Sequence, residues 1–461
     1  MNKWKILVAA LLLAAVGAQA EKQQPPAGGE PKDFKLTETY DFSLDNGLDV
    51  TFVQYGDTPK VTLRMVTATG NVDDGEHDAV SDMVYELLTE GTATRSAREI
   101  AEQSAGMGGQ VNTSVSANSS YVQMDVLSEY AADAAALIAD LVQNSVYAEE
   151  DLLRAKNNFI RDLKVQKSQA QGQAAEAFYQ AVYSDHPYGK VFADESVVET
   201  LGTEQVKAFA DANLVASRSH LYVSGKFDQA QVEKAVKAAF ASMPKGQPTD
   251  VTAPAGKGAG KFVFVPREDA PQSTLRLGLP VVDPSHEDYV GLGVMNTLLG
   301  GSFSSRITSN IREDKGYTYS PSSTIATRVK SGTWFQTADV TAEATGPALA
   351  EIIKEIKRLQ TEAPAEQELQ GFKNYISGIF VLQNSSRTAI INQLWFLKSH
   401  DLPLSRLETY VQQVNDLSPK QISALAAKYL PLEKMTLVVV GDESVKSQLT
   451  EVPELKEIFK L

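Results

Sequence analysis

The chain has 461 residues, with 58 Asp and Glu against 43 Lys and Arg, a formal net charge of −15 and no cysteine. The absence of cysteine excludes disulfides and thiolate metal sites, so any bound metal would need histidine or carboxylate ligands. The acidic balance argues against nucleic acid as a partner, because neutralising phosphates requires clustered Lys and Arg. The length exceeds what one hydrophobic core usually organises, so two or more domains are expected.

The N-terminal residues 1–20 have the pattern of a signal peptide. A positively charged start precedes an apolar run over residues 6–17, and residues 18–20 read AQA, the small-x-small pattern that signal peptidase recognises. We therefore expect cleavage after Ala20 and a periplasmic location. Residues 21–33 are polar and rich in Pro and Gly, which predicts a flexible tail. No later stretch approaches about eighteen uninterrupted apolar residues, so no membrane span is expected.

Runs in which apolar and polar residues alternate predict strands, and longer amphipathic runs predict helices. In the first half the predicted strands are 61–68 and 121–127, and the predicted helices are 79–90, 131–141 and 149–167. In the second half the predicted strands are 274–279 and 333–340, and the predicted helices are 289–299, 346–359 and 366–382. Strands grouped with long helices, without strict alternation, predict an α+β fold with helices packed on mostly antiparallel sheets.

A sequence repeat with a fixed offset of 216 residues divides the chain into two similar halves. Residues 201–225 read LGTEQVKAFADANLVASRSHLYVSG, and residues 417–441 read LSPKQISALAAKYLPLEKMTLVVVG. Each copy is typical of an amphipathic helix, a short loop and a strand that ends in glycine. Because a match at constant offset indicates duplication, we predict two homologous lobes over residues 34–244 and 261–461. The Gly- and Pro-rich segment 245–260 between them is expected to be a linker.

The most distinctive motif of the chain is LLGGSFSSRITSNIREDKGYTYS, at residues 298–320. Its two glycines are expected to end one helix, and a serine at 302, 304 or 305 is expected to cap the next. That second helix is predicted to run to about Asp314. Gly316 then permits a turn into a strand that begins near Tyr317.

This motif resembles the C-terminal lobe signature of the pitrilysin/insulinase-like metallopeptidases, peptidase family M16. Segments of the first half, at 45–54, 90–109 and 186–189, also fit that family in the expected order. The resemblance covers residues from about 40 to 450. It implies two similar lobes, joined by a linker, that close like a clamshell around an unfolded peptide.

The resemblance implies a substrate-binding role for Arg312 and Tyr319, which occupy the positions of an Arg and a Tyr that bind the peptide backbone in this family. A guanidinium fork and a phenolic hydroxyl are suited to holding peptide carbonyls or a developing oxyanion. The alternative is that Arg312 pairs with a neighbouring carboxylate, Glu313 or Asp314, and that Tyr319 is simply half-buried. Arg306 is expected to be structural.

Active members of this family carry a His-x-x-Glu-His zinc motif on a helix of the first lobe, and the corresponding helix here reads SDMVYELLTEGT, at residues 81–92. The two histidine positions fall on Asp82 and Glu86, and the general-base position falls on Tyr85. The third ligand position, on a later helix, falls on Asp162. No two of the five histidines are spaced four apart, so we expect this chain to bind no zinc. The three carboxylates could instead hold a hard cation such as Ca²⁺ or Mg²⁺, or form a solvated acidic face.

The family resemblance therefore implies a non-catalytic, substrate-binding subunit of a heterodimeric zinc peptidase that acts on unfolded peptides. A partner subunit would carry the His-x-x-Glu-His motif and the zinc, and this chain would supply Arg312 and Tyr319. Two alternatives stay open at this point. One is a peptidase-derived structural scaffold with no proteolytic role, and the other is a free-standing peptide-binding protein of the cell envelope.

Overall fold

The computed structural model describes residues 35, 38–254 and 260–459. The expected signal peptide and tail, residues 1–20 and 21–33, lie outside the described residues, as does part of the expected linker. Within the described ranges, no helix is both long enough and apolar enough to cross a membrane.

The first half is built on a six-stranded sheet with the strand order β1-β2-β6-β3-β5-β4. Neighbouring strands are antiparallel except for β2 and β6, which run parallel. The side chains of β5 alternate between buried and half-buried positions, as expected for a pleated strand with one face in the core. The strand bounds are β1 Thr39–Ser43, β2 Asp49–Gln54, β3 Lys60–Thr67, β4 Val111–Val115, β5 Ser120–Leu127 and β6 Ser219–Gly225.

Helices cover the core face of this sheet, and α4 shows why they form there. Its residues Ala134, Leu137, Ile138 and Leu141 are fully buried, at the spacing that places side chains on one face of a helix. Helix α4 packs on α9, and α2 packs on α8. The helix bounds are α2 Val80–Leu87, α3 Ala97–Gly106, α4 Ala131–Asn144, α5 Glu149–Ser168, α6 Ala170–Tyr183, α7 Glu195–Thr200, α8 Thr203–Asn213 and α9 Gln229–Ala239.

The second half is built on a five-stranded sheet with the order β7-β11-β8-β10-β9. Its strands are β7 Phe262–Pro266, β8 Gln272–Val281, β9 Ser322–Arg328, β10 Ser331–Thr341 and β11 Thr436–Gly441. Its helices are α10 Tyr289–Leu299, α11 Arg306–Thr308, α12 Thr345–Thr361, α13 Glu366–Gln383, α14 Arg387–Ser399, α15 Ser405–Asp416, α16 Pro419–Tyr429, α17 Lys446–Glu451 and α18 Pro453–Phe459. Trp334 of β10 is fully buried in the core between sheet and helices.

The two sheets repeat one topology, as the sequence repeat predicts. The order β2-β6-β3-β5-β4 in the first sheet matches β7-β11-β8-β10-β9 in the second, and each has a single parallel pair, β2 with β6 or β7 with β11. Helices α8 and α16 begin and end 216 residues apart, and the strands that follow them end at Gly225 and Gly441. The predicted α+β fold with two similar, mostly antiparallel lobes is therefore confirmed.

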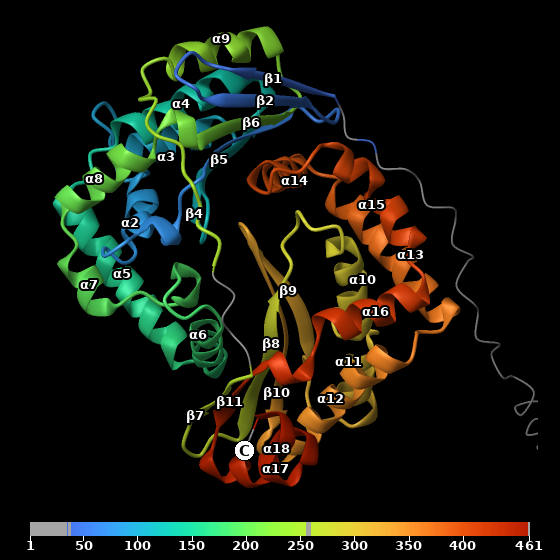
Figure 1. Ribbon diagram of the computed structural model, residues 1–461. Helices are drawn as coiled ribbons and strands as arrows, with labels where there is room; N and C mark the ends of the chain where they lie inside the picture. Colours follow the sequence, from blue (N-terminus) through green and yellow to red (C-terminus); the bar gives the residue numbers. More distant parts are fainter. Residues whose placement is uncertain (1–34, 36–37, 255–259, 460–461) are drawn as a thin grey trace, which may run out of the picture. The chain divides into compact units, whose positions relative to one another are not determined.

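Two equivalent helices are exchanged between the halves. Helix α6 belongs to the first half but packs on strands β8 and β11 of the second sheet, where its Phe178 contacts Phe335 and Val438 lies in the same cluster. Helix α14 belongs to the second half but packs on β3 and β6 of the first sheet, through Ile391 and its neighbours. Each helix thus covers the sheet face that its own half does not cover (Figure 1).

Polar contacts fix α14 on the first sheet. Arg387 Nη2 donates to Asp125 Oδ1 of β5 at 3.0 Å, and Lys398 forms an ion pair with Asp49 of β2. Aromatic stacking dominates at the other exchanged helix, where the Tyr179 ring of α6 contacts two guanidinium groups at 4.7 and 5.1 Å. The halves are therefore held together by contacts far from the linker in sequence.

Candidate functional site

The turn before Arg312 depends on glycine. Helix α10 is followed by Gly300, whose N–H donates to the carbonyl of Asn296 at 3.0 Å. A Cβ at Gly300 would lie 2.6 Å from both Gln336 Oε1 and Ser323 Oγ, so a larger residue here would require these two side chains to move. Gly316 has a φ of +65°, in the left-handed region that favours glycine, and it ends the next helical segment as predicted.

Arg312 lies in a π-helix. The predicted second helix ends at Asp314 as expected, but only its first turn, α11, is α-helical, and Ser309–Asp314 wind as a π-helix. Ser305 is the residue at the helix start, but its hydroxyl donates to Thr308 Oγ1 at 3.0 Å and caps no backbone N–H. π-Helical turns are rare and occur frequently at functional sites.

The prediction of a strand near Tyr317 is wrong. The Tyr317 N–H donates back to the carbonyl of Ile311 at 2.8 Å, so only the carbonyl of this residue pairs with the sheet, where it accepts the Thr341 N–H at 3.3 Å. Thr318 makes only an isolated bridge with Val340, and β9 begins at Ser322. The segment between them is consequently a loop that carries Tyr319 at the surface.

Arg312 and Tyr319 lie together, and Phe303 joins them. The Arg312 guanidinium carbon is 4.7 Å from the centre of the Tyr319 ring and 4.5 Å from the centre of the Phe303 ring. Arg312 Nε is 3.0 Å from Glu313 Oε1, so the ion pair that was the alternative interpretation is present. Tyr319 is not half-buried, since it is 81% exposed. Sequence reasoning missed Phe303, although a large aromatic residue among Gly and Ser was a visible signal.

Arg306 has the structural position expected of it. Its Nε and Nη2 donate to the two carboxylate oxygens of Glu368 on α13, each at 2.8 Å. These hydrogen bonds from Arg306 lower the pKa of the Glu368 carboxyl. This paired contact ties the start of α11 to α13, whereas the side chain of Arg312 is 25% exposed and lies beside two exposed rings.

The four residues that the family resemblance assigned to zinc-site positions line one pocket in the first half. Asp82, Tyr85 and Glu86 of α2 and Asp162 of α5 all line a cavity of about 240 Å³ between the two helices and β4. The sequence register that assigned these four residues to one site therefore brings together side chains that are neighbours in space. Asp162 is the most peripheral of them, with a side chain 66% exposed.

The residues present do not fit a zinc ion. Zinc sites of this class need two imidazoles and a carboxylate with good geometry, whereas α2 presents Asp82 and Glu86, and Asp82 accepts a hydrogen bond from Asn71 Nδ2 at 2.8 Å. Tyr85 is 1% exposed and lies in the core, and burial raises the pKa of its hydroxyl, so it cannot replace a carboxylate as a general base. Within the described part of the chain, no group of three or more His, Asp and Glu side chains is arranged to hold a metal.

Two carboxyl groups at the start of α2 are poorly solvated. Burial raises the pKa of Asp82 to about 6, with a further upward contribution from Glu86 and an opposing one from the hydrogen bond with Asn71. Burial also raises the pKa of Asp74 to about 6, although its carboxylate accepts two backbone N–H groups at the start of the helix, at 3.0 and 3.1 Å. Both carboxyl groups are therefore harder to ionise than an exposed aspartate, and Asp82 is the one that lines the pocket.

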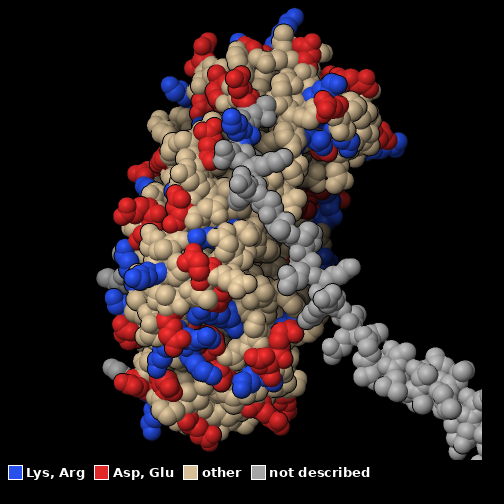
Figure 2. Space-filling view, turned by 90° about the vertical axis from the view of Figure 1, so that its right-hand side faces the viewer, with Lys and Arg blue, Asp and Glu red and all other residues tan. Residues whose placement is uncertain are grey.

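A larger cavity of about 1220 Å³ adjoins this pocket and shares Asp82 and Asp162 with it. Carboxylates outnumber cationic side chains in its lining, which includes Asp74, Asp78, Asp82, Asp162, Glu176, Asp185, Asp194 and Glu195 against Lys167, Lys190 and Arg328. Asp78 is paired with Lys190. On the outer face shown in Figure 2, acidic and basic side chains are interspersed. The cavity lining, in contrast, is predominantly acidic.

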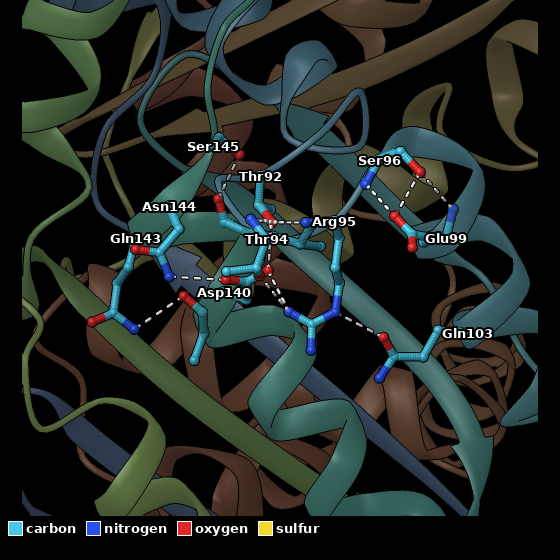
Figure 3. A network of polar contacts seen from close by, with 12 residues as sticks. Thr92, Thr94, Arg95, Ser96, Glu99, Gln103, Asp140, Gln143, Asn144 and Ser145 are labelled. Carbon is cyan, nitrogen blue, oxygen red and sulfur yellow. Dashed lines mark hydrogen bonds and ion pairs between the residues drawn. The ribbon is translucent and has the colours of Figure 1, made fainter.

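The segment at 90–109 that contributed to the family resemblance is a structural network (Figure 3). Arg95 Nη1 donates to Asp140 Oδ2 at 2.7 Å, and Thr92 Oγ1 donates to the same oxygen at 2.8 Å. Ser96 and Glu99 form a reciprocal capping box that starts α3. These polar groups are satisfied by one another, so the segment positions α3 against α4 and contributes no free functional group.

His186, the histidine nearest the acidic cavity, has a structural position. Its Nδ1 accepts the N–H of Tyr188 at 3.2 Å, and its Nε2 is 3.1 Å from the carbonyl oxygen of Thr252. Both ring nitrogens are engaged with the backbone, so His186 holds the loop after α6.

Comparison with family models gives two matches along the chain. Residues 50–195 match the model described as insulinase (peptidase family M16), and residues 200–376 match the model described as the peptidase M16 inactive domain. An uncharacterized zinc protease of Rickettsia felis is 26% identical over 72% of this chain and 81% of its own length. An uncharacterized zinc protease of Bacillus subtilis is 24% identical over 87% of this chain and 97% of its own length.

Solved structures with the same fold support these matches. A structure titled as a peptidase M16 inactive domain from Pseudomonas fluorescens superposes with a TM-score of 0.82 at 24% identity, covering 88% of this chain and 98% of that one. A protease from Helicobacter pylori superposes with a TM-score of 0.80 at 19% identity, covering 88% of this chain and 100% of that one. At these identities the likeness establishes the two-lobed fold.

Proposed function

The chain belongs to peptidase family M16, and we propose that it is the non-catalytic, substrate-binding subunit of a periplasmic zinc peptidase heterodimer that acts on unfolded peptides. The observation that carries the proposal is the contrast between two sites. The pocket at the proposed zinc positions holds Asp82, Tyr85 and Glu86, a set unsuited to zinc, whereas the exposed Tyr319 ring lies against the partly exposed guanidinium of Arg312.

Arg312 is placed to hold a peptide backbone. Its Nε is engaged with Glu313, and within the described residues its two Nη groups have no hydrogen-bond partner in the protein. Stacking against the Tyr319 ring restricts the guanidinium, so less conformational freedom is lost when it donates to a peptide carbonyl. The exposed Tyr319 hydroxyl provides a further donor nearby.

The partner in this proposal is a family member that carries the His-x-x-Glu-His motif and holds the zinc. This chain contributes peptide binding and leaves the hydrolytic chemistry to that partner. Its acidic cavity adds a polar surface that is compatible with an extended peptide chain, which carries many unpaired backbone N–H groups.

The experiment combines the mature chain with a co-expressed relative bearing the His-x-x-Glu-His motif. Cleavage of a quenched unstructured peptide and bound zinc are measured for each chain alone and for the mixture. We expect activity only in the mixture and zinc only in the partner. Activity and zinc in this chain alone, sensitive to its own substitutions, would overturn the proposal.

The double variant Arg312→Ala, Tyr319→Phe then tests the binding role. Loss of hydrogen bonds from a charged donor and a hydroxyl, about 1.5–3 kcal/mol for the charged one, predicts at least a roughly tenfold loss of kcat/KM in the mixture. Arg98→Ala is the matched control, because Arg98 is an exposed arginine paired only along its own helix with Glu102. Unchanged cleavage by the double variant would favour the structural scaffold.

A further inference from the structure

Phe303 is a large apolar side chain that the fold leaves exposed beside Arg312. It follows Gly300 and Gly301 in the loop between α10 and α11 and is 66% exposed. Ile307 and Ile311, the next apolar residues along the chain, are fully buried in the core of the second half. The same segment thus places two apolar side chains in the core, whereas Phe303 lies at the surface.

No other phenylalanine among the described residues is exposed to this extent. The aromatic side chains that are similarly exposed are Tyr40, Tyr319 and Tyr375, and Tyr319 contacts the same guanidinium as Phe303. Two of the four exposed aromatic rings of the described chain thus meet at Arg312. An isolated exposed apolar residue needs no explanation, but a pair of them around one cation defines a local surface.

We infer that the Phe303 ring is a side-chain subsite that binds an apolar or aromatic residue of the peptide held by Arg312. The inference rests on the proposed function, because it takes the peptide-binding role of Arg312 and Tyr319 as its premise. It adds a substrate preference, for peptides with a large apolar side chain next to the carbonyl that Arg312 grips.

The geometry decides which kind of side chain this surface accepts. The Arg312 guanidinium carbon lies 4.5 Å from the centre of the Phe303 ring. A cationic side chain of the peptide at the same ring would therefore be repelled by Arg312. Phe303 has no hydrogen-bonding group and therefore offers nothing to a polar side chain. Removing apolar area from water is the favourable term that remains, and it selects side chains such as Leu or Phe.

Peptide geometry allows both contacts at once. In an extended peptide the side chains alternate between faces, with neighbours on one face about 7 Å apart. A carbonyl bound to an Arg312 Nη group lies within a few ångströms of the ring that stacks on the same guanidinium. One side chain of the bound peptide is thereby brought over Phe303 without any change in the backbone contact.

The test uses two labelled, unstructured peptides made of Ser, Gly, Thr and Ala, identical except that one carries a single Leu at its centre. Because Leu is the only large apolar side chain present, the peptide can adopt the register that places this Leu on the subsite. Binding is measured by fluorescence anisotropy with the mature chain, alone and with the motif-bearing partner. Partial burial of one Leu predicts that wild type binds the Leu peptide about fivefold to tenfold more tightly than its Ser counterpart.

Variants separate a subsite from a structural role. Phe303→Ala is expected to abolish the preference for Leu while changing affinity for the Ser peptide less than about twofold, and Phe303→Tyr is expected to retain the preference. Leu153→Ala is the matched control. Leu153 is 57% exposed on α5, two residues from Ala155 and therefore on the side of that helix away from the pocket.

The outcomes distinguish this inference from the function on which it rests. Binding of both peptides with a preference that survives Phe303→Ala overturns the subsite and leaves the proposed function standing. Equal weakening of both peptides by Phe303→Ala shows that the ring acts through the fold or through Arg312, and also overturns it. Absence of binding by wild type, with and without the partner, overturns both.

Discussion

Replacing Asp82 by Asn should stabilise the protein at alkaline pH and have little effect at acidic pH. Asp82 lines the pocket between α2 and α5, and burial raises its pKa from 3.8 to about 6. The amide oxygen of asparagine can still accept the hydrogen bond that Asn71 Nδ2 donates. The substitution therefore removes the charge while preserving shape and contact.

The sign and size of the change in the free energy of unfolding follow from the linkage between protonation and folding. A carboxyl whose pKa is raised in the folded state contributes stability that is fully present below its unfolded pKa, near 4, and is lost as the pH rises through about 6. A shift of this size corresponds to roughly 3 kcal/mol at pH 8. Partial solvent exposure of Asp82 screens the charge and reduces the expected gain to about 1–2 kcal/mol.

Urea unfolding at pH 4 and pH 8, followed by tryptophan fluorescence, to which the buried Trp334 and the partly buried Trp395 contribute, measures the effect. Asp82→Asn should be more stable than wild type at pH 8 and nearly equal to it at pH 4. Asp162→Asn is the control, because it removes an exposed carboxylate from the same pocket, and it should change stability by less than about 0.5 kcal/mol at both pH values. An equal effect of Asp82→Asn at the two pH values would refute the reasoning.

Two further predictions concern the first sheet. Ile391→Ala on α14 should destabilise the protein by about 2–5 kcal/mol, because this fully buried side chain packs on the first sheet as a core residue would. Far-ultraviolet circular dichroism during urea unfolding should show one transition. A separate early transition with the first half intact would contradict this. Burial lowers the pKa of His220 to about 3 from 6.5, so its contribution is present above pH 6.5 and is lost as the pH falls toward 3. His220→Phe, which keeps an aromatic ring stacked on Tyr222, should therefore lose less stability than wild type between pH 7 and pH 4.5, as measured by urea midpoints; parallel losses would count against it.

The sequence predicted correctly those elements whose bounds depend on neighbouring residues, such as an apolar run that ends at a glycine. Helix α10 occupies the predicted range 289–299 because its apolar run ends at Gly300, which lies close against the side chains of Gln336 and Ser323. The duplicated topology followed from the repeat. The strand expected at Tyr317 failed because alternation alone does not reveal that its N–H is already bonded to Ile311. A π-helix has no comparable sequence pattern, so the winding around Arg312 was not predictable.

The candidate site shows the same division. The register that placed Asp82, Glu86 and Asp162 at one site came from the family resemblance, and the three residues line one pocket. Burial of Tyr85 and the raised pKa of Asp82 depend on how α2 packs on other elements, which spacing cannot supply. The contact between Phe303 and Arg312 joins the loop after α10 to the π-helix. Such contacts depend on backbone geometry that one sequence does not specify.

The exchange of α6 and α14 bears on how such a chain arose. Each half leaves one face of its sheet to be covered by the helix of the other, so one copy of the repeat would expose residues such as Val66 and Tyr222 to water. A gene that encoded a single copy would have produced a protein whose fold is completed only by a twin. Joining two such genes through the segment at 245–260 converts an obligatory pair of molecules into one, and it frees each copy to diverge in sequence.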